Sequence, residues 1–305
     1  MKAPTDCLYL ISLKQKIMIP TTNKITKPTV LKALCLWGLL LFVLPARAQT
    51  DLNRYTTHST LFGIGHLNQM DTYLSPFEYE GLQGSIVHEK FRPTHWLDGR
   101  IVTQQKTEGY LGLSKNPAQS ASAISGSLSY KIGWHYSWTL ASSLRLFAGG
   151  GIQMLAGGVY NTRNGNNPAQ ALARTGLYAS GIAAYPFHIR KQPFQIRYQI
   201  DLPFCGMMFS PNYNQSYYEI FTLGNYDHNI RFIHPGNAPT LYQSLTLDFP
   251  IKGFTFRVGY GCDIEQSRVN GIKNHSYRHS FLIGYVKDFY FLKRKENRHK
   301  NLPNF

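Results

Sequence analysis

Hydrophobic and polar residues alternate along several stretches of this chain. From Phe254 to Glu265, one set of alternate positions is apolar and the other is small, polar or charged, and the same holds for residues 194–204 and 124–134. Successive side chains of a β-strand point to opposite faces of the sheet, so the pattern predicts strands with one apolar and one polar face. A soluble β-sandwich and a transmembrane β-barrel both contain such strands.

The lengths and connections of the predicted strands favour the barrel. Most of them reach the ~9–11 residues that a tilted membrane-spanning strand needs. Short connections flanked by aromatic residues, such as 134–138 and 249–254, alternate with longer ones rich in Asn, Gly, Pro and Ser. An outer-membrane barrel has short turns at its periplasmic end and long loops at its extracellular end. The strands are expected at 58–67, 79–90, 97–110, 121–134, 138–156, 173–187, 194–205, 240–249, 254–266 and 276–291.

We therefore predict an all-β fold, a transmembrane antiparallel up-and-down β-barrel of about ten strands within residues 49–292. Eight or twelve strands remain possible. The segment 58–67 is the weakest strand, and the loop 206–239 contains two further strand-like segments, either a hairpin in the wall or a ribbon above it. The other long loops are expected at about 68–78, 112–120, 157–173 and 267–275.

The first 48 residues have the order of a secretory signal peptide. Lysines precede an apolar run at 31–44, and Ala46 and Ala48 fit a small-residue cleavage site, although the true start is possibly Met18. We expect export to the outer membrane of a Gram-negative bacterium, with outer-membrane lipid and the barrel-assembly machinery as partners. Residues 293–305 would form a basic periplasmic tail.

Charge and cysteine content limit the binding partners and covalent links that the sequence predicts. The net charge of +16 includes a strongly basic leader, and the other basic residues are scattered, so nucleic acid is not expected as a partner. Cys205 and Cys262 remain after cleavage, and their alternation places them on opposite faces, so no disulfide is predicted. No Cys or His cluster indicates a metal or a cofactor.

The polar face of the strands predicts a charged lumen. Phe256, Val258 and Tyr260 would face lipid, a charge at Val258 would cost roughly 2–4 kcal/mol, and a serine at Arg257 would be milder. The side chains expected to meet inside the barrel are Arg197, Asp201, Arg257, Asp263 and Glu265.

Several motifs resemble those of a known family. They are residues 165–168 (GNNP), 209–213 (FSPNY) with 216–219 (SYYE), 245–250 (LTLDFP) and 277–285 (YRHSFLIGY). The chain resembles uncharacterised outer-membrane β-barrel proteins of Bacteroidetes that share a domain of unknown function. The resemblance implies fold and location, and no activity.

Binding or a structural role is favoured over catalysis. A narrow channel, a structural barrel and surface binding of a glycan or protein all fit the sequence. The loop residues considered for binding are Tyr160, Tyr213, Tyr217, Tyr218 and Tyr226.

The alternative is an outer-membrane hydrolase, phospholipase-like or omptin-like, with a histidine-based site at the extracellular rim. His135 and Ser137 have the i, i+2 spacing of a phospholipase-type site, but they lie in an expected periplasmic turn. Asp227, His228 and Asp71 are the rim candidates for an omptin-like site. No rim segment supplies a nucleophile, a base and an orienting group together, so no catalytic residue is assigned.

Overall fold

The computed structural model describes residues 56–140, 144–165 and 167–287, all within one compact unit, Ala46–Phe305. The predicted signal peptide and the basic tail lie outside the described residues, as does the end of the last predicted strand. No helix among the described residues is long and apolar enough to cross a membrane.

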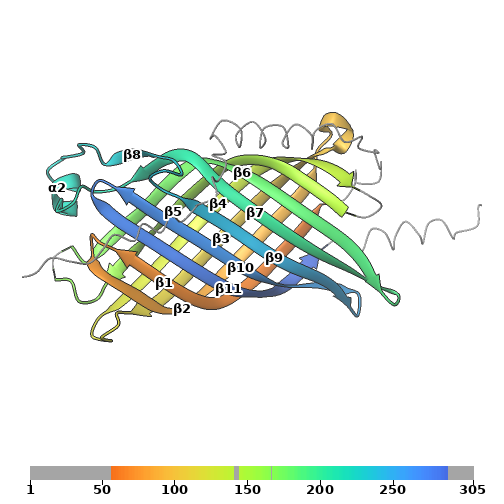
Figure 1. The fold of residues 1–305 in the computed structure, drawn as a ribbon, viewed down its shortest axis with the longest axis horizontal. Helices are drawn as coiled ribbons and strands as arrows, with labels where there is room; N and C mark the ends of the chain where they lie inside the picture. Colours follow the sequence, from red (N-terminus) through yellow and green to blue (C-terminus); the bar gives the residue numbers. More distant parts are fainter. Residues whose placement is uncertain (1–55, 141–143, 166, 288–305) are drawn as a thin grey trace, which may run out of the picture. The chain divides into compact units, whose positions relative to one another are not determined.

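The strands form one closed antiparallel barrel (Figure 1). Each strand pairs with its neighbour in sequence, β1 pairs with β11, and β6 pairs with β7, so the sheet closes on itself. Ten strands form the wall, as predicted, and β8 pairs only with the end of β7. The wall strands are β1 (Thr57–Asp71), β2 (Ser75–Pro93), β3 (Ile101–Lys115), β4 (Ser122–Leu140), β5 (Leu144–Asn161), β6 (Ala169–Ile189), β7 (Gln192–Phe209), β9 (Thr240–Ile251), β10 (Phe254–Val269) and β11 (Ile272–Lys287).

The barrel has two different ends. The connections β2–β3, β4–β5, β6–β7 and β9–β10 lie at one end, here called the turn end, together with the start of β1 and the end of β11. The other five connections lie at the opposite end, here called the loop end. There the segment between β7 and β9 forms a short helix, α2 (Tyr217–Phe221), and β8 (Ile230–Ile233) (Figure 1).

Most loops at the loop end are shorter than the sequence predicted. The expected loop at 267–275 is a two-residue turn, in which Asn270 and Gly271 have φ of +52° and +77°. Positive φ at both central residues is the geometry of a type I′ hairpin turn, which Asn-Gly favours. The expected loops at 68–78, 112–120 and 157–173 also shrink, because the strands on both sides continue through polar residues above the apolar band.

Three further expectations about strands were wrong. The tight turn expected at 134–138 lies inside β4, which runs on to Leu140. The start of the strand expected at 97–110 is a short 3-10 helix, η2 (Trp96–Gly99), and β3 begins at Ile101. The loop 206–239 contributes neither a wall hairpin nor a free ribbon, because β8 extends the wall beside the end of β7.

A β-bulge changes the facing of the end of β7. Tyr178 pairs with Pro203 and Leu177 pairs with Cys205, so Phe204 is an extra residue. The bulge shifts the alternation by one, and Cys205 shares the outward direction of Leu177, whereas the sequence placed it on the polar face. Cys205 and Cys262 are both free thiols, and β9 lies between their strands. The absence of a disulfide therefore stays a prediction, which now rests on the separation of the strands and not on opposite facing.

The barrel is apolar outside and polar inside along most of its length. Large hydrophobic side chains such as Phe62, Leu111 and Ile283 are exposed on the outer surface. Inside, an apolar cluster around Val102 and Phe147 lies near the turn end, and another around Leu74 and Tyr79 lies near the loop end. Charged side chains line the lumen between these two clusters, around a second cavity whose lining includes Glu89, Lys106 and Asp263.

Candidate functional site

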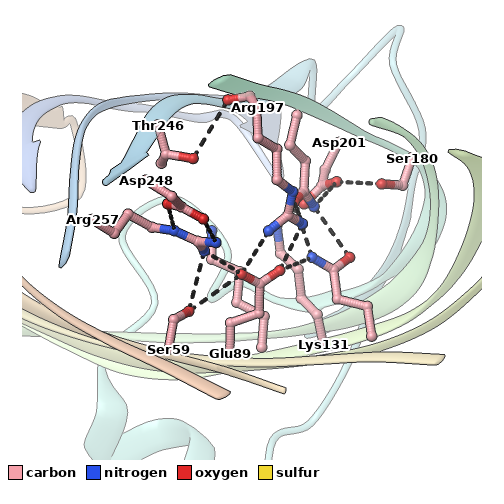
Figure 2. A network of polar contacts seen from close by, with 12 residues as sticks. Ser59, Glu89, Lys131, Ser180, Arg197, Asp201, Thr246, Asp248 and Arg257 are labelled. Atoms are coloured by element: carbon pink, nitrogen blue, oxygen red, sulfur yellow. Dashed lines mark hydrogen bonds and ion pairs between the residues drawn. The ribbon is translucent and has the colours of Figure 1, made fainter. Parts of the chain in front are cut away.

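Glu89 of β2 is the centre of the charged lumen nearer the turn end. Figure 2 shows its carboxylate between the guanidinium groups of Arg197 (β7) and Arg257 (β10). Arg197 donates two hydrogen bonds to it, of 2.7 and 2.8 Å, and Arg257 donates one of 3.1 Å. Gln104 donates a further bond of 2.5 Å. Charge-assisted bonds of this kind, several of them bidentate, are strong and directional.

Arg257 also forms a bidentate pair with Asp248 on the neighbouring strand β9. Its Nε and Nη2 donate to the two carboxylate oxygens at 2.6 and 2.8 Å. Arg257 and Asp248 are opposite each other in the register of β9 and β10, so the sheet itself aligns them. Both side chains are almost fully buried.

The network continues along the lumen through Gln199. This amide accepts a bond of 2.8 Å from Arg197 and donates one of 2.9 Å to Asp201. Asp201 also accepts from Lys131 Nζ on β4 at 3.0 Å and from Ser180 at 2.7 Å (Figure 2). The ammonium of Lys131 lies 3.8 Å from the centre of the Tyr242 ring, which is a cation–π contact. Tyr242 connects these charged residues to a second layer, or tier, of charged residues nearer the loop end.

Arg278 of β11 organises the tier nearer the loop end. Its Nη2 lies 2.7 Å from Asp263, 3.5 Å from Glu108 and 3.6 Å from Glu265. Glu265 also pairs with Arg174 of β6 across the lumen. The Tyr242 hydroxyl donates to Glu265 at 3.0 Å and accepts from Arg174, so this tier is connected to the one below it.

Six carboxylates and six cations of the described lumen therefore form this network. None of the five lumen residues named from the sequence pairs directly with another of the five; each pairs with a residue that the sequence analysis did not name. Those partners lie at inward positions of their strands. The alternation of the sequence could therefore have shown that they face the lumen, but not which charged residue each of them pairs with. The twelve are Glu89, Glu108, Asp201, Asp248, Asp263, Glu265, Lys106, Lys131, Arg174, Arg197, Arg257 and Arg278.

A cavity lies above this network at the loop end. Its volume is about 780 Å³, including space open to solvent. Arg174 and Glu265 lie at its base, and aliphatic side chains including Leu74, Val159 and Leu172 form its walls. A concave site with apolar walls and a few polar groups is the usual form of a small-molecule site.

Two polar atoms of the cavity lining are buried without a hydrogen-bond partner. They are Nε of Arg174, which is a donor, and Oγ of Ser276, which both donates and accepts. Buried polar groups in proteins are normally paired, because an unmade bond costs about 1–3 kcal/mol. Both atoms are inaccessible in this conformation, so an acceptor on a ligand would pair with them only after a small side-chain rearrangement.

The predicted binding tyrosines do not form one group. Tyr160, Tyr213, Tyr218 and Tyr226 are exposed at the loop end, whereas Tyr217 is packed into the loop. Its hydroxyl accepts a bond from the Ala171 N–H, and it stacks on the ring of Phe221.

The short helix that carries Tyr217 is fixed at its start. Ser216 and Glu219 form a capping box there, each side chain bonding the other residue's backbone N–H. Burial raises the pKa of Tyr217 to about 12, so its hydroxyl stays protonated. Tyr217 therefore positions this loop beside the cavity.

The candidate histidines form pairs without a nucleophile. His228 and Asp227 make an exposed ion pair of 2.5 Å, and Tyr260 and His279 make a hydrogen bond of 2.6 Å on the outer wall. His135 is fully buried, and neither ring nitrogen has a hydrogen-bond partner. Within the described ranges, no group of three or more His, Cys, Asp or Glu side chains is arranged to hold a metal ion.

Comparison with known proteins gives a family match and several distant structural likenesses. A family described as a protein of unknown function, DUF3316, matches residues 31–296. No curated protein matches the chain.

Three solved barrels illustrate the structural likenesses. The transport unit of the autotransporter AIDA-I from Escherichia coli has 7% identity and a TM-score of 0.41, over 83% of this chain and 97% of that one. An outer membrane channel from Pseudomonas putida F1 has 9% identity and a TM-score of 0.36, over 80% and 100%. Ail, the attachment invasion locus protein of Yersinia pestis, has 7% identity and a TM-score of 0.27, over 76% and 99%. Such distant likenesses do not indicate what this chain binds.

Proposed function

We propose that this chain, which belongs to the DUF3316 family of proteins of unknown function, is an exported, integral outer-membrane β-barrel that binds a small molecule at its loop end. The membrane location is supported by the closed wall and its exposed apolar band. Hydrocarbon cannot satisfy free backbone groups, and closure leaves no sheet edge. The loop end faces the cell exterior, because the longer connections of outer-membrane barrels lie there.

The cavity at the loop end carries the proposal of binding. It opens toward the exterior, while the ion-pair network lies between it and the turn end. Every cation of the network has a carboxylate partner, so a passing ion would have to break buried pairs. The barrel therefore acts as a closed receptacle and not as a channel.

The chemistry of the cavity defines a class of ligand. Aliphatic walls suit a small apolar body, and the free atoms of Arg174 and Ser276 suit an acceptor such as a carboxylate or a carbonyl. An amphipathic molecule with one acceptor group satisfies both features. The described lining contains both His275 and Ser276, but non-enzymatic binding is preferred because no hydrogen bond joins the Ser276 hydroxyl to a base there.

Calorimetric titration of the purified, folded chain with octanoate and with octylammonium tests the proposal. Octanoate should bind more tightly, because both unpartnered atoms can donate to its carboxylate. Ser276→Ala should weaken octanoate binding, whereas Ser137→Ala, at the turn end, should leave it unchanged. Equal binding of the two probes, or an equal effect of the two variants, would contradict the proposal.

The hydrolase alternative makes a separate expectation. Turnover of phospholipid or peptide by the purified chain, abolished by His228→Ala, would replace binding with catalysis at the exposed Asp227–His228 pair. If the binding proposal holds, neither the native chain nor the His228→Ala variant should turn over phospholipid or peptide.

A further inference from the structure

One part of the outer wall breaks the apolar pattern of the rest. In the hairpins β6–β7 and β9–β10, outward residues stay apolar or aromatic down to the turn, as Leu247, Phe249, Phe256 and Val258 illustrate. In the hairpin β2–β3 three successive outward positions of each strand near the turn are polar, and Ile101 lies beyond them at the start of β3. With two residues of β1, they form a surface that we name the polar patch: His58, Thr60, His88, Lys90, Arg92, Thr103, Gln105 and Thr107.

The register makes the polar patch continuous. Thr60 pairs with His88, which pairs with Thr107, and the side chains of Thr60 and His88 are hydrogen-bonded at 3.0 Å. The row beneath runs from His58 through Lys90 to Gln105. In the last row Arg92 pairs with Thr103.

Apolar and aromatic residues surround the polar patch. The row above it contains Phe62 and Ile86, both more than half exposed. On the β4 side its rows end at Tyr130, Ile132 and Trp134.

On the β11 side the upper row of the patch ends at Tyr285 and its second row ends at Lys287. At the tip of the hairpin Trp96 is exposed. Since Trp prefers the membrane interface, the polar patch lies at membrane depth and not below it.

The chemistry of the polar patch is one-sided. Lys90 and Arg92 are cations, and the histidines, the threonines and Gln105 supply further hydrogen-bond donors. None of its eight residues is acidic. Cations on a lipid-facing wall are unfavourable against acyl chains, most strongly at the midplane and less near the interface. An anion with several acceptor oxygens would remove that cost.

We propose that the polar patch binds the phosphate head group of a phospholipid from the leaflet at the turn end. Lys90 and Arg92 contact the phosphate, His88 and Gln105 donate to its ester oxygens, and the acyl chains lie along the apolar row above. A second copy of this chain is disfavoured as occupant, because it would bring the same cations against the patch. This inference rests on the proposed function, since a lipid occupant requires that the barrel span a membrane.

Native mass spectrometry of the full chain tests the proposal. The protein is released from nanodiscs of phosphatidylcholine with a minor share of phosphatidylglycerol, and retained phosphatidylglycerol is counted. Lys90→Gln/Arg92→Gln should lower retention about tenfold, because two charge-assisted contacts are lost. The matched control, Lys191→Gln/Lys252→Gln, removes two cations from the turns of other hairpins and should retain lipid like the native chain. Equal loss in both double variants, or loss in neither, would overturn the proposal.

A second measurement separates head-group binding from simple contact with acyl chains. His88→Leu/Gln105→Leu should lower lipid retention. Unchanged retention together with a higher melting temperature in the nanodisc would show that acyl chains cover the patch, against the proposal. A photo-crosslinker at Gln105 in native membranes should capture lipid, and a protein adduct there would also contradict it.

These outcomes are distinguishable from failure of the proposed function. If the chain does not insert into nanodiscs at all, the membrane location fails and this inference fails with it. If the chain inserts and binds octanoate but the patch variants retain lipid normally, only this inference fails.

Discussion

Individual residues of the lumen act through their partners. Glu89 is enclosed by two guanidinium groups and an amide, and among the described residues no other carboxylate is paired with Arg197. Neutralising Glu89 would therefore leave a buried guanidinium without a counter-charge.

Glu89→Gln should destabilise the barrel by about 3–5 kcal/mol, the usual cost of breaking a buried ion pair from one side. Glu80→Gln is the matched control, because Glu80 lies on the same strand at an exposed position and bonds only the Asn68 amide. Its effect should stay within about 0.5 kcal/mol. Urea unfolding in lipid vesicles measures both, and equal midpoints would contradict the assigned role of Glu89.

The pairs of Arg257 reverse one expectation from the sequence. A serine there was expected to be milder than a charge at Val258, but Arg257 is held by Asp248 and Glu89. Arg257→Ser leaves Asp248 buried and unpaired, so a loss of about 3–5 kcal/mol is expected. Val258→Arg faces outward and should cost about 2–4 kcal/mol. Unfolding of the two variants in the same vesicles gives the order, and a near-neutral Arg257→Ser would show that water replaces the arginine.

At the scale of elements, turns and bulges decide where strands end and which way they face. The Asn270–Gly271 turn lets β10 and β11 continue where a loop was expected, and a Cβ at Gly271 would require an unfavourable positive φ. Gly271→Ala should cost about 1 kcal/mol. Gly165→Ala is the control, because no atom lies within 4 Å of its added Cβ and its φ is not positive. Equal stability of both variants would indicate that the turn relaxes freely.

The bulge in β7 gives an expectation for the thiols. Cys205 and Cys262 lie on strands that β9 separates, so both should react with a small alkylating reagent after unfolding without reductant. Mass spectrometry counts the labels. Labelling that requires prior reduction would reveal a disulfide and displace one of these strands.

At the scale of the whole molecule, the lumen network predicts a barrel that does not conduct. In planar bilayers the native chain should show no ionic current, because paired charges occupy the lumen. Gel mobility should still change on heating, since the closed sheet resists detergent until it is boiled. A steady native conductance would favour a channel and overturn the closed-lumen proposal.

Alternation, together with the strand lengths and the two kinds of connection, predicted an antiparallel barrel of ten strands. Alternation alone assigned Arg197, Asp201, Arg257, Asp263 and Glu265 to its inward side. The reason is local: the facing of a side chain follows from its position in a strand. Alternation could not identify Glu89, Asp248, Lys131, Arg174 and Arg278 as partners, because pairing depends on the register between strands and on closure across the lumen.

Three other features were decided only by the tertiary structure. The extra residue Phe204 reverses the direction in which the Cys205 side chain points, and residue propensities do not predict such a bulge. The cavity above the charged tier combines residues from strands far apart in sequence, so it exists only once the barrel has closed. The polar patch depends on the register between the neighbouring strands β1, β2 and β3.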